Sequence, residues 1–253
     1  MTTPSALRRL AQRLLPLLDL TDPAAATPAA IRRLCARART PAGNVAALCL
    51  PVGALATAKP DLAGSAVPLA GLVNFPDGAG APDAVSAELA AALAAGAEEI
   101  ELVLPYRAVI AGDAAAATAL VRNARAICGR RILLKAVLET GRLGTPALIH
   151  QAAEAAIAGG ADFLVTSTGF VEPGASLAAA ATLLAVIAEA RTRRRWVGFK
   201  AQGGIRTLSD AQPYLALYDR VLGEGAAGAA TFRIGGDALL NDVLLALGQR
   251  IEE

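Results

Sequence analysis

The sequence predicts an α/β protein, a (β/α)8 TIM barrel built from eight parallel strands. Short apolar runs recur from one end of the chain to the other, and segments of helical pattern separate them. The length of 253 residues suits this fold, since one such barrel typically takes about 250 residues. The runs are LLDLT (17–21), NVAALCL (44–50), LAGLVNFP (69–76), EEIELVLPY (98–106), ILLKAVLETG (132–141), ADFLVTSTG (161–169), WVGFKAQGG (196–204) and ATFRIGG (230–236). Runs this continuous are typical of strands buried on both faces, and an open doubly wound sheet is the alternative architecture.

Helix start and stop signals lie between the runs. Thr27 followed by Pro28 opens one helix, because proline suits the first helical position. Leu208 begins another helix. The side chains predicted to cap further helices are Asp83, Asp113 and Thr145. Glycines stand where helices should end, at Gly96, Gly129 and Gly160. No linker divides the chain, so we expect a single domain over 1–253, with an N-terminal helical extension at 1–16.

The composition favours a large core and no highly charged partner. The sequence is 55% hydrophobic but only 4% aromatic, so small and branched side chains must fill the core. The 24 basic and 22 acidic residues leave a formal net charge of +2, which predicts no strong attraction to nucleic acid or membrane. We interpret the arginine-rich stretches at 32–33 and 191–195 as solvated helix ends, with a binding patch as the alternative.

Cysteine use and the N-terminal region indicate a cytoplasmic protein. The three cysteines, Cys35, Cys49 and Cys128, lack metal-binding spacing and leave one unpaired in any disulfide scheme. The first 20 residues show neither a long apolar region nor a clear cleavage site of a signal peptide. We expect no metal and no cofactor, because no cluster of histidines, cysteines and carboxylates has usable spacing. A homodimer is an open alternative to a monomer.

Charged residues inside apolar runs point to a functional site. In a barrel of this kind, chemistry takes place where the carboxyl ends of the strands meet. Glu101, Lys135 and Lys200 interrupt apolar runs, and Asp19 lies near the same end. Buried charges are costly unless they are paired, so we expect these side chains to point inward, with at least two within ion-pair distance. A purely structural ion-pair network is the alternative, but the grouping favours an active site.

Six motifs occur in the order found in deoxyribose-phosphate aldolases. They are LLDLT (17–21), VNFPDG (73–78), EEIELVLPYRAVIAGD (98–113), ILLKAVLETG (132–141), GADFLVTSTGF (160–170) and VGFKAQGGIRT (197–207). The chain resembles this family from Leu17 to about Leu247. The resemblance implies the barrel fold and the reversible condensation of acetaldehyde with glyceraldehyde 3-phosphate.

The resemblance also implies roles for individual residues. The family uses an unprotonated lysine to form an imine with an aldehyde, and a second lysine keeps the pKa of the first one low. The second lysine falls on Lys200, the helper carboxylate on Asp19, and the lysine of the fifth strand on Lys135. Glu101 stands where the family usually has aspartate. The imine-forming lysine itself is replaced by Val165, and valine cannot form an imine.

The resemblance implies a substrate site at the ends of the later strands. Its expected residues are Thr168, Gly169, Gly203, Gly204, Arg206, Gly235 and Asp237. The Gly-rich turn can offer backbone N–H groups to an anion. However, Phe170 replaces a lysine that is usual in the family, and Asp237-Ala238 replaces a pair of serines. A carboxylate repels phosphate, so we expect a small aldehyde or sugar-like substrate that is not a sugar phosphate.

Three functions remain open. The first is an aldolase-like lyase acting on small aldehydes, with Lys200 as its reactive amine. The second is a catalytically silent barrel that binds a small carbonyl or anionic ligand. The third is proton transfer by Glu101, Asp19 and Lys200 without an imine. Three other residues are expected to have no role in these functions. Cys49 is expected to be a bystander thiol, His150 a surface side chain and Trp196 a packed side chain.

Overall fold

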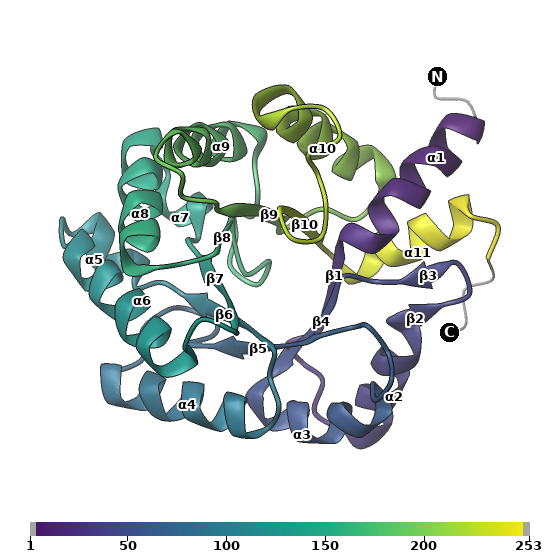
Figure 1. Ribbon diagram of the computed structural model, residues 1–253, viewed down its shortest axis with the longest axis horizontal. Helices are drawn as coiled ribbons and strands as arrows, with labels where there is room; N and C mark the ends of the chain where they lie inside the picture. The colour runs from purple at the N-terminus through teal and green to yellow at the C-terminus, as the bar shows by residue number, and fades with distance from the viewer. Residues whose placement is uncertain (1–3, 250–253) are drawn as a thin grey trace.

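The computed structural model describes residues 4–249, and within them eight parallel strands close into a barrel (Figure 1). The order around the barrel is β1-β10-β9-β8-β7-β6-β5-β4. The strands are β1 (Leu18–Thr21), β4 (Ala47–Pro51), β5 (Leu69–Val73), β6 (Glu99–Val103), β7 (Leu133–Val137), β8 (Phe163–Val165), β9 (Gly198–Gln202) and β10 (Phe232–Gly235). A separate hairpin pairs β2 (Arg39–Thr40) with β3 (Gly43–Asn44). The predicted barrel is confirmed, each predicted run overlaps one strand of the barrel, and the open-sheet alternative is wrong.

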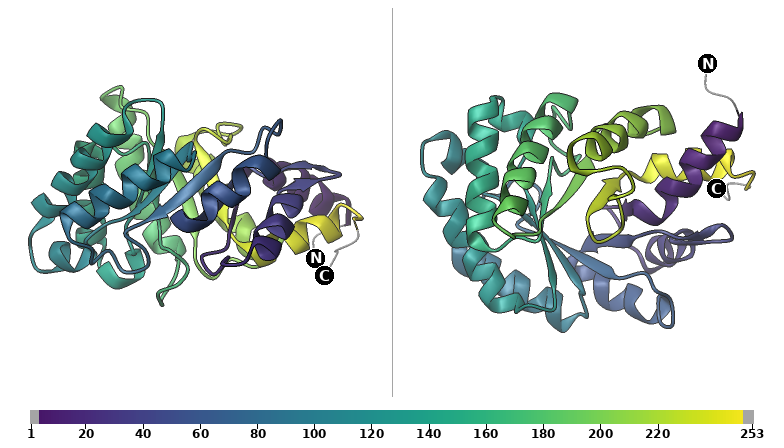
Figure 2. Two further views of the ribbon diagram at one scale, coloured as in Figure 1. Left: turned by 90° about the horizontal axis from the view of Figure 1, so that it is seen from below. Right: turned by 45° about the horizontal axis from the view of Figure 1, so that its top comes forward.

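Helices surround the barrel (Figures 1 and 2). The longer ones are α2 (Pro28–Arg37), α3 (Val52–Asp61), α4 (Pro82–Ala94), α6 (Ala114–Cys128), α8 (Pro146–Gly159), α9 (Leu177–Thr192), α10 (Leu208–Leu222) and α11 (Asp237–Ala246). Two short helices, α5 (Tyr106–Ile110) and α7 (Thr140–Leu143), lie in loops after strands. Among the described helices, none combines the length and hydrophobicity needed to span a bilayer.

The predicted N-terminal helix is present as α1 (Pro4–Leu14), followed by a 3-10 turn, η1 (Leu15–Leu17). Positions 1–3 of the predicted extension lie outside the described residues. Helix α1 packs against α10 and α11 beside the barrel (Figures 1 and 2).

Helix termini follow local signals in the sequence. The predicted caps at Thr27, Asp113 and Thr145 are confirmed, since each side chain accepts a hydrogen bond from a backbone N–H in the first turn. The predicted cap at Asp83 is wrong, because α4 already begins at Pro82. Asp83 lies instead within the first turn, where its negative charge favours the positive end of the helix dipole.

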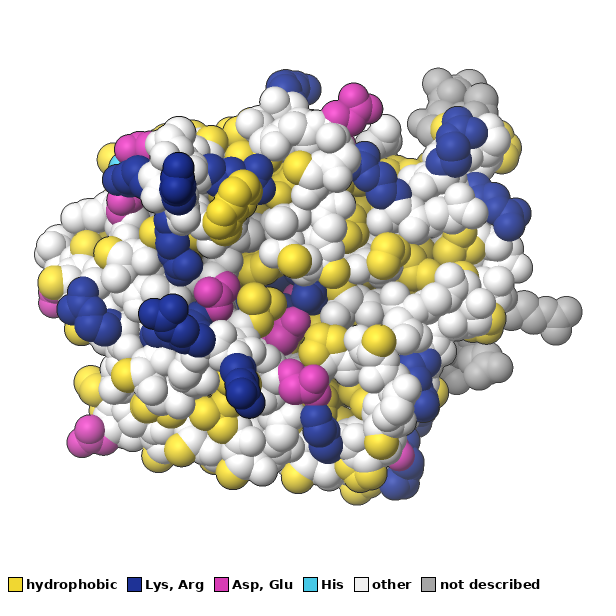
Figure 3. Space-filling view, in the orientation of Figure 1, with side chains coloured by type: hydrophobic (Ala, Val, Ile, Leu, Met, Phe, Trp, Pro, Cys, Tyr) yellow, Lys and Arg dark blue, Asp and Glu magenta, His cyan; other side chains and the backbone are white. Residues whose placement is uncertain are grey.

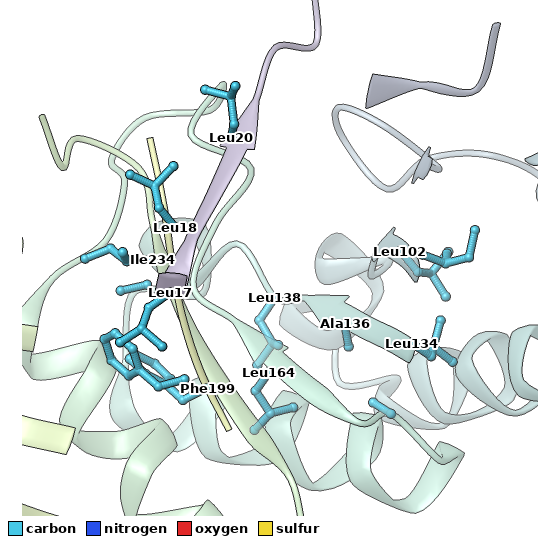
Figure 4. Close-up of a cluster of buried hydrophobic side chains, with 14 of the residues drawn as sticks. Leu17, Leu18, Leu20, Leu102, Leu134, Ala136, Leu138, Leu164, Phe199 and Ile234 are labelled. Carbon is cyan, nitrogen blue, oxygen red and sulfur yellow. The ribbon is translucent and has the colours of Figure 1, made fainter. Parts of the chain in front are cut away.

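Side chains alternate between the barrel interior and the helix layer along each strand. Figure 4 shows the apolar side chains of one buried cluster, among them Leu134, Ala136 and Phe199. Lys135 stands between the first two in β7, and Lys200 follows Phe199 in β9. Because the strand period is two, both lysines face the barrel interior while their neighbours contact helices. The fold thus directs the charged residues of these strands to one place.

Gly198 at the start of β9 leaves room for the buried ring of Phe163. A Cβ atom at this position would overlap that ring, so we expect Gly198→Ala to lower the free energy of unfolding by about 1–3 kcal/mol through overpacking. Gly53→Ala in α3 is the control, because its Cβ would meet no heavy atom within 4 Å. That substitution should be neutral or slightly stabilising. Denaturation in urea measures both variants, and equal midpoints would contradict the prediction.

Candidate functional site

A network of buried charged side chains fills the barrel interior. Its members come from β1, β6, β7, β9 and β10 and are Asp19, Glu99, Glu101, Lys135, Lys200 and Arg233. Each residue is at most 5% exposed. Three cations therefore face three carboxylates, which leaves the network without net charge. The predicted inward orientation and ion pairing of Glu101, Lys135 and Lys200 are confirmed.

Lys135 lies among three carboxylates. Its Nζ is 2.5 Å from Asp19 Oδ2, 2.7 Å from Glu99 Oε2 and 3.2 Å from Glu101 Oε1. Burial disfavours the charged amine, but the attraction of these carboxylates outweighs burial and raises the pKa of Lys135 well above its ordinary value. Lys135 is therefore a fixed positive charge at the centre of the network.

Lys200 is held in the same way. Its Nζ lies 3.0 Å from Asp19 Oδ2, forms an ion pair with Glu101 and is 3.9 Å from Cys49 Sγ. Burial lowers the pKa of this amine, whereas Asp19, Cys49 and Glu101 raise it, and the net shift is upward. The protonated amine has no free lone pair, so Lys200 in this arrangement is a counter-ion rather than a nucleophile.

Asp19 and Arg233 connect the lysines to the remaining carboxylate. Arg233 Nη1 donates to Asp19 Oδ1 at 2.5 Å, and Nη2 donates to Glu99 Oε1 at 2.9 Å. Burial alone would raise the pKa of Asp19, but Lys135, Lys200 and Arg233 outweigh it and hold this pKa below its ordinary value. Asp19 therefore stays ionised and contacts all three cations.

Two members of the network, Glu99 and Arg233, had not been assigned a catalytic or substrate-binding role. A signal for both was present in the sequence. Glu99 lies two residues before Glu101, which places both side chains on one face of β6. Arg233 interrupts an apolar run between Phe232 and Ile234, as the two lysines interrupt theirs. Treating every charge in a buried strand alike would have identified them.

An apolar cluster occupies the position where the resemblance implies a reactive amine. Val103, Val137 and Val165 are buried and pack together with Phe75. Val165 pairs in register with Val137 on β7 and with Lys200 on β9. Position 165 is therefore the immediate neighbour of Lys200, but its side chain cannot react with a carbonyl group.

Cys49 lies at the edge of the ion network. Its thiol is fully buried and donates to Glu101 Oε1 at 3.4 Å. Burial, and then the nearby charge of Glu101, raise the pKa of Cys49 far above its ordinary value. The residue is thus a neutral thiol rather than a thiolate nucleophile, in agreement with its interpretation as a bystander.

The fold brings together possible metal ligands that sequence spacing did not reveal. Asp19, Cys49 and Glu101 each offer a ligand atom, and these atoms lie within 4.8 Å of one another. Sequence spacing could not reveal this grouping, because these residues come from three strands that are distant in sequence. The ammonium groups of Lys135 and Lys200 already contact the two carboxylates. A second, more exposed group consists of His150, Glu154 and Glu189.

Several expected substrate-binding residues do lie together after β8 and β9. Gln202 Nε2 donates to the carbonyl oxygen of Thr168 at 2.6 Å. A Cβ atom on Gly169 would lie 3.5 Å from Gly203 Cα, so the two turns are in contact. Gly235 packs against the Gln202 side chain, which leaves no space for a Cβ atom there. These glycines allow the loops after β8 and β9 and the end of β10 to approach one another closely.

The remaining expected residues are more exposed. Gly204 faces open space, since a Cβ atom there would meet nothing within 4 Å. The backbone N–H of Arg206 donates to Asp210 at 3.0 Å, and its side chain is exposed. Asp237 begins α11 and forms a 2.5 Å ion pair with Arg37. Its carboxylate thus brings negative charge to a helix N-terminus that would otherwise favour an external anion.

Comparisons with known proteins show consistent similarity. A family model described as DeoC/LacD family aldolase matches residues 19–233. The deoxyribose-phosphate aldolase of Agrobacterium fabrum is 43% identical over 239 residues, covering 94% of this chain and 91% of that protein. The crystal structure of a proposed deoxyribose-phosphate aldolase from Toxoplasma gondii gives a TM-score of 0.89 at 25% identity and covers 98% of this chain and 97% of that one. A tetrameric deoxyribose phosphate aldolase from Aeropyrum pernix shares the fold, with a TM-score of 0.72 at 22% identity over 96% of this chain and 93% of that one.

Removing one network cation should destabilise the protein strongly. Lys135→Met leaves three buried carboxylates with too little positive charge, so we expect a loss of roughly 3–5 kcal/mol in the free energy of unfolding at neutral pH. Lys59→Met is the matched control, because Lys59 pairs with Glu98 on the surface and should contribute less than about 1 kcal/mol. Urea denaturation of both variants measures the difference. Equal losses in the two variants would show that Lys135 contributes no more to stability than a surface ion pair does.

Stability should also depend on pH in a defined direction. Although burial raises the pKa values of Asp19 and Glu101, the neighbouring cations outweigh it and lower both. Their stabilising contribution is therefore complete above the unfolded-state values of about 3.9 and 4.3 and is lost as the pH falls further. Lys135 and Lys200, whose pKa values are raised, contribute fully to stability below about pH 10.4, the unfolded-state pKa of lysine.

We accordingly expect the free energy of unfolding to decline below about pH 4, and the deficit of Lys135→Met to shrink there because its carboxylates protonate more readily. Urea titrations of both proteins across this range measure the effect. A deficit that is independent of pH would contradict it.

Proposed function

The chain belongs to the DeoC/LacD aldolase family, and we propose that it is a deoxyribose-phosphate aldolase-like protein that binds small aldehydes without efficient Schiff-base cleavage. One observation carries the proposal. Position 165 is valine, and its neighbour in register, Lys200, is held as an ammonium by Asp19 and Glu101. Imine formation requires a neutral amine, and neither position provides one.

The protonation of Lys200 sets the scale of this effect. An amine with the ordinary pKa of about 10.4 is neutral in only about one molecule in 2,500 at pH 7. The pKa of Lys200 is raised further, since burial is outweighed by its acidic neighbours. Attack on an aldehyde by Lys200 should therefore be slow. A lyase that nevertheless forms its imine on Lys200 is the second candidate, because this amine lies closest in register to position 165.

Proton transfer without an imine receives less support. A general base works best when its pKa is near the working pH. The pKa values of Asp19 and Glu101 are both lowered, because the nearby cations outweigh burial. Carboxylates of this kind are weak bases, and their oxygens are already engaged by ammonium groups.

The side chains at the carboxyl ends of the strands indicate the class of substrate. Phe170, which is 62% exposed, contacts Phe75 in an edge-to-face pair with ring centroids 5.6 Å apart. Asp237 adds a carboxylate that is paired with Arg37. Both features disfavour a phosphate group relative to an uncharged aldehyde or sugar-like compound. The proposed function requires no cofactor, and we propose that the protein forms a homodimer. We also propose a cytoplasmic location, because the three unpaired cysteines suit a reducing compartment.

Restoring an amine at position 165 should restore imine formation. A lysine there would lie beside Lys200, and repulsion between the two ammonium groups would lower the pKa of one of them. We expect Val165→Lys to be labelled at position 165 when acetaldehyde and borohydride are added, and the unmodified protein to be labelled little or not at all. The added amine should cost about 1–3 kcal/mol of stability by overpacking.

Val137→Lys is the matched control, because Val137 belongs to the same apolar cluster but is not the partner of Lys200 in register. It should not be labelled to the same extent. Peptide mapping identifies the modified residue. Rapid turnover by the unmodified chain with label on Lys200 would establish the second candidate instead. A folded but unlabelled Val165→Lys protein would show that more of the site has diverged.

Phosphate recognition should be weak and partly recoverable. We expect calorimetry to show no preference of the protein for glyceraldehyde 3-phosphate over glyceraldehyde. The double substitution Phe170→Lys and Asp237→Ser should strengthen binding of the phosphorylated form by roughly tenfold, as expected for one charge-assisted hydrogen bond. Asp83→Ser, which removes an exposed charge from α4, is the control. A strong preference of the unmodified chain for the phosphate would contradict the prediction.

A further inference from the structure

A pocket lies at the end of the barrel opposite the carboxyl ends of the strands. Its volume is about 250 Å³, and its wall includes the first residues of three neighbouring strands, Leu133, Phe163 and Gly198. Thr231, which directly precedes β10, completes this side. Parallel strands all begin at the same end of a barrel, so this pocket is separate from the site at their carboxyl ends.

The pocket is strongly basic. Arg130, Arg131 and Arg191 line it, and Asp162 is its one acidic lining residue. Asp162 is already neutralised, because Arg125 forms an ion pair with it. Figure 3 shows Lys and Arg side chains over the region of α8 and α9, as well as along the opposite edge of this face. The lining thus has unbalanced positive charge, which favours an anionic ligand.

Arg191 has an unused hydrogen-bond donor within this wall. Its Nη2 donates to the Tyr218 hydroxyl at 3.1 Å, and Nη1 donates to the carbonyl oxygen of Leu222 at 3.3 Å. Its Nε is buried and has no acceptor among the described residues. A buried donor without an acceptor is unfavourable. The groups that hold Arg191 are neutral, so its positive charge adds to the unbalanced charge of the pocket wall.

Trp196 stands beside the arginines at the same pocket. The expectation that it is a packed side chain is wrong, because the side chain is 69% exposed. It lies in the loop before β9, where the guanidinium of Arg191 is 5.3 Å from the ring centroid. An indole that remains this exposed offers a stacking surface for another planar ring.

We propose that this pocket binds a mononucleotide. The phosphate would contact Arg130, Arg131 and Arg191, since guanidinium groups match phosphate oxygens in charge and geometry. The base would stack on Trp196, because every base presents a flat π face. The site is independent of aldehyde chemistry at the other end of the barrel. It also replaces our interpretation of Arg191 as part of a solvated helix end.

Trp196 provides the readout, since it is the single tryptophan of the sequence. The full chain is titrated with adenosine monophosphate, adenosine and inorganic phosphate while tryptophan fluorescence is recorded. We expect saturable quenching by adenosine monophosphate at a concentration at least roughly tenfold below that needed for either fragment, because only the nucleotide engages both halves of the site. The absence of saturable quenching, or equal binding of phosphate alone, would overturn the proposal.

Two pairs of substitutions test the location. Arg130→Gln with Arg131→Gln should weaken nucleotide binding by roughly tenfold or more without changing the thermal midpoint, because both side chains are exposed. Arg32→Gln with Arg33→Gln removes the same charge from α2 and should leave binding unchanged. Equal weakening by both pairs would reduce the effect to net charge and overturn the proposal. Much tighter binding of a single-stranded oligonucleotide than of the mononucleotide would overturn it in favour of nucleic acid.

Discussion

The carboxylate of Asp19 is the group on which the barrel interior depends. It contacts Lys135, Lys200 and Arg233. Asp19 therefore links β1 to its neighbour β10 and, across the barrel interior, to β9 and β7. Removing a carboxylate from water costs several kcal/mol, and only a full set of partners compensates for that cost. The alternation of the strands makes this possible, because it sends every charged residue of these strands inward while their neighbours pack against helices. The same rule that builds the core therefore concentrates charge at its centre.

Charge balance connects this network to the chemistry of the site. With valine at position 165, three cations face three carboxylates. The ion pairs favour the protonated form of each cation. A lysine at position 165 would bring a fourth cation next to Lys200 without a fourth carboxylate. One amine would then be favoured in its neutral form, which is the reactive state. Val165 adds no charge beside Lys200, which leaves Lys200 fully compensated. Stability and reactivity are thus opposed within one set of side chains.

Much of this arrangement could be predicted from the sequence, for identifiable reasons. Continuous apolar runs define the eight strands, and charges within them identify Glu101, Lys135 and Lys200, because burial of a charge is costly enough to require partners. Helix caps at Thr27 and Thr145 depend on local hydrogen bonds and were also predictable. Contacts between distant strands were not. The grouping of Asp19, Cys49 and Glu101, and the exposure of Trp196, depend on how the barrel closes and on loop geometry, neither of which has a local signature.

The two ends of the barrel differ in what their residues need. At the carboxyl ends of the strands, the buried charges pair with one another and Val165 lies in an apolar cluster, although buried oxygens of Glu139 and Gln202 lack partners there. The opposite end of such a barrel ordinarily serves stability, yet here it carries features that stability does not require. An indole exposed to water and a buried guanidinium nitrogen without an acceptor each raise the free energy of the folded protein. Both belong to one pocket, together with uncompensated arginines. The exposed indole and the arginines without carboxylate partners are the features that the proposed nucleotide site would explain, and they lie at the end of the barrel opposite the family's reactive residues.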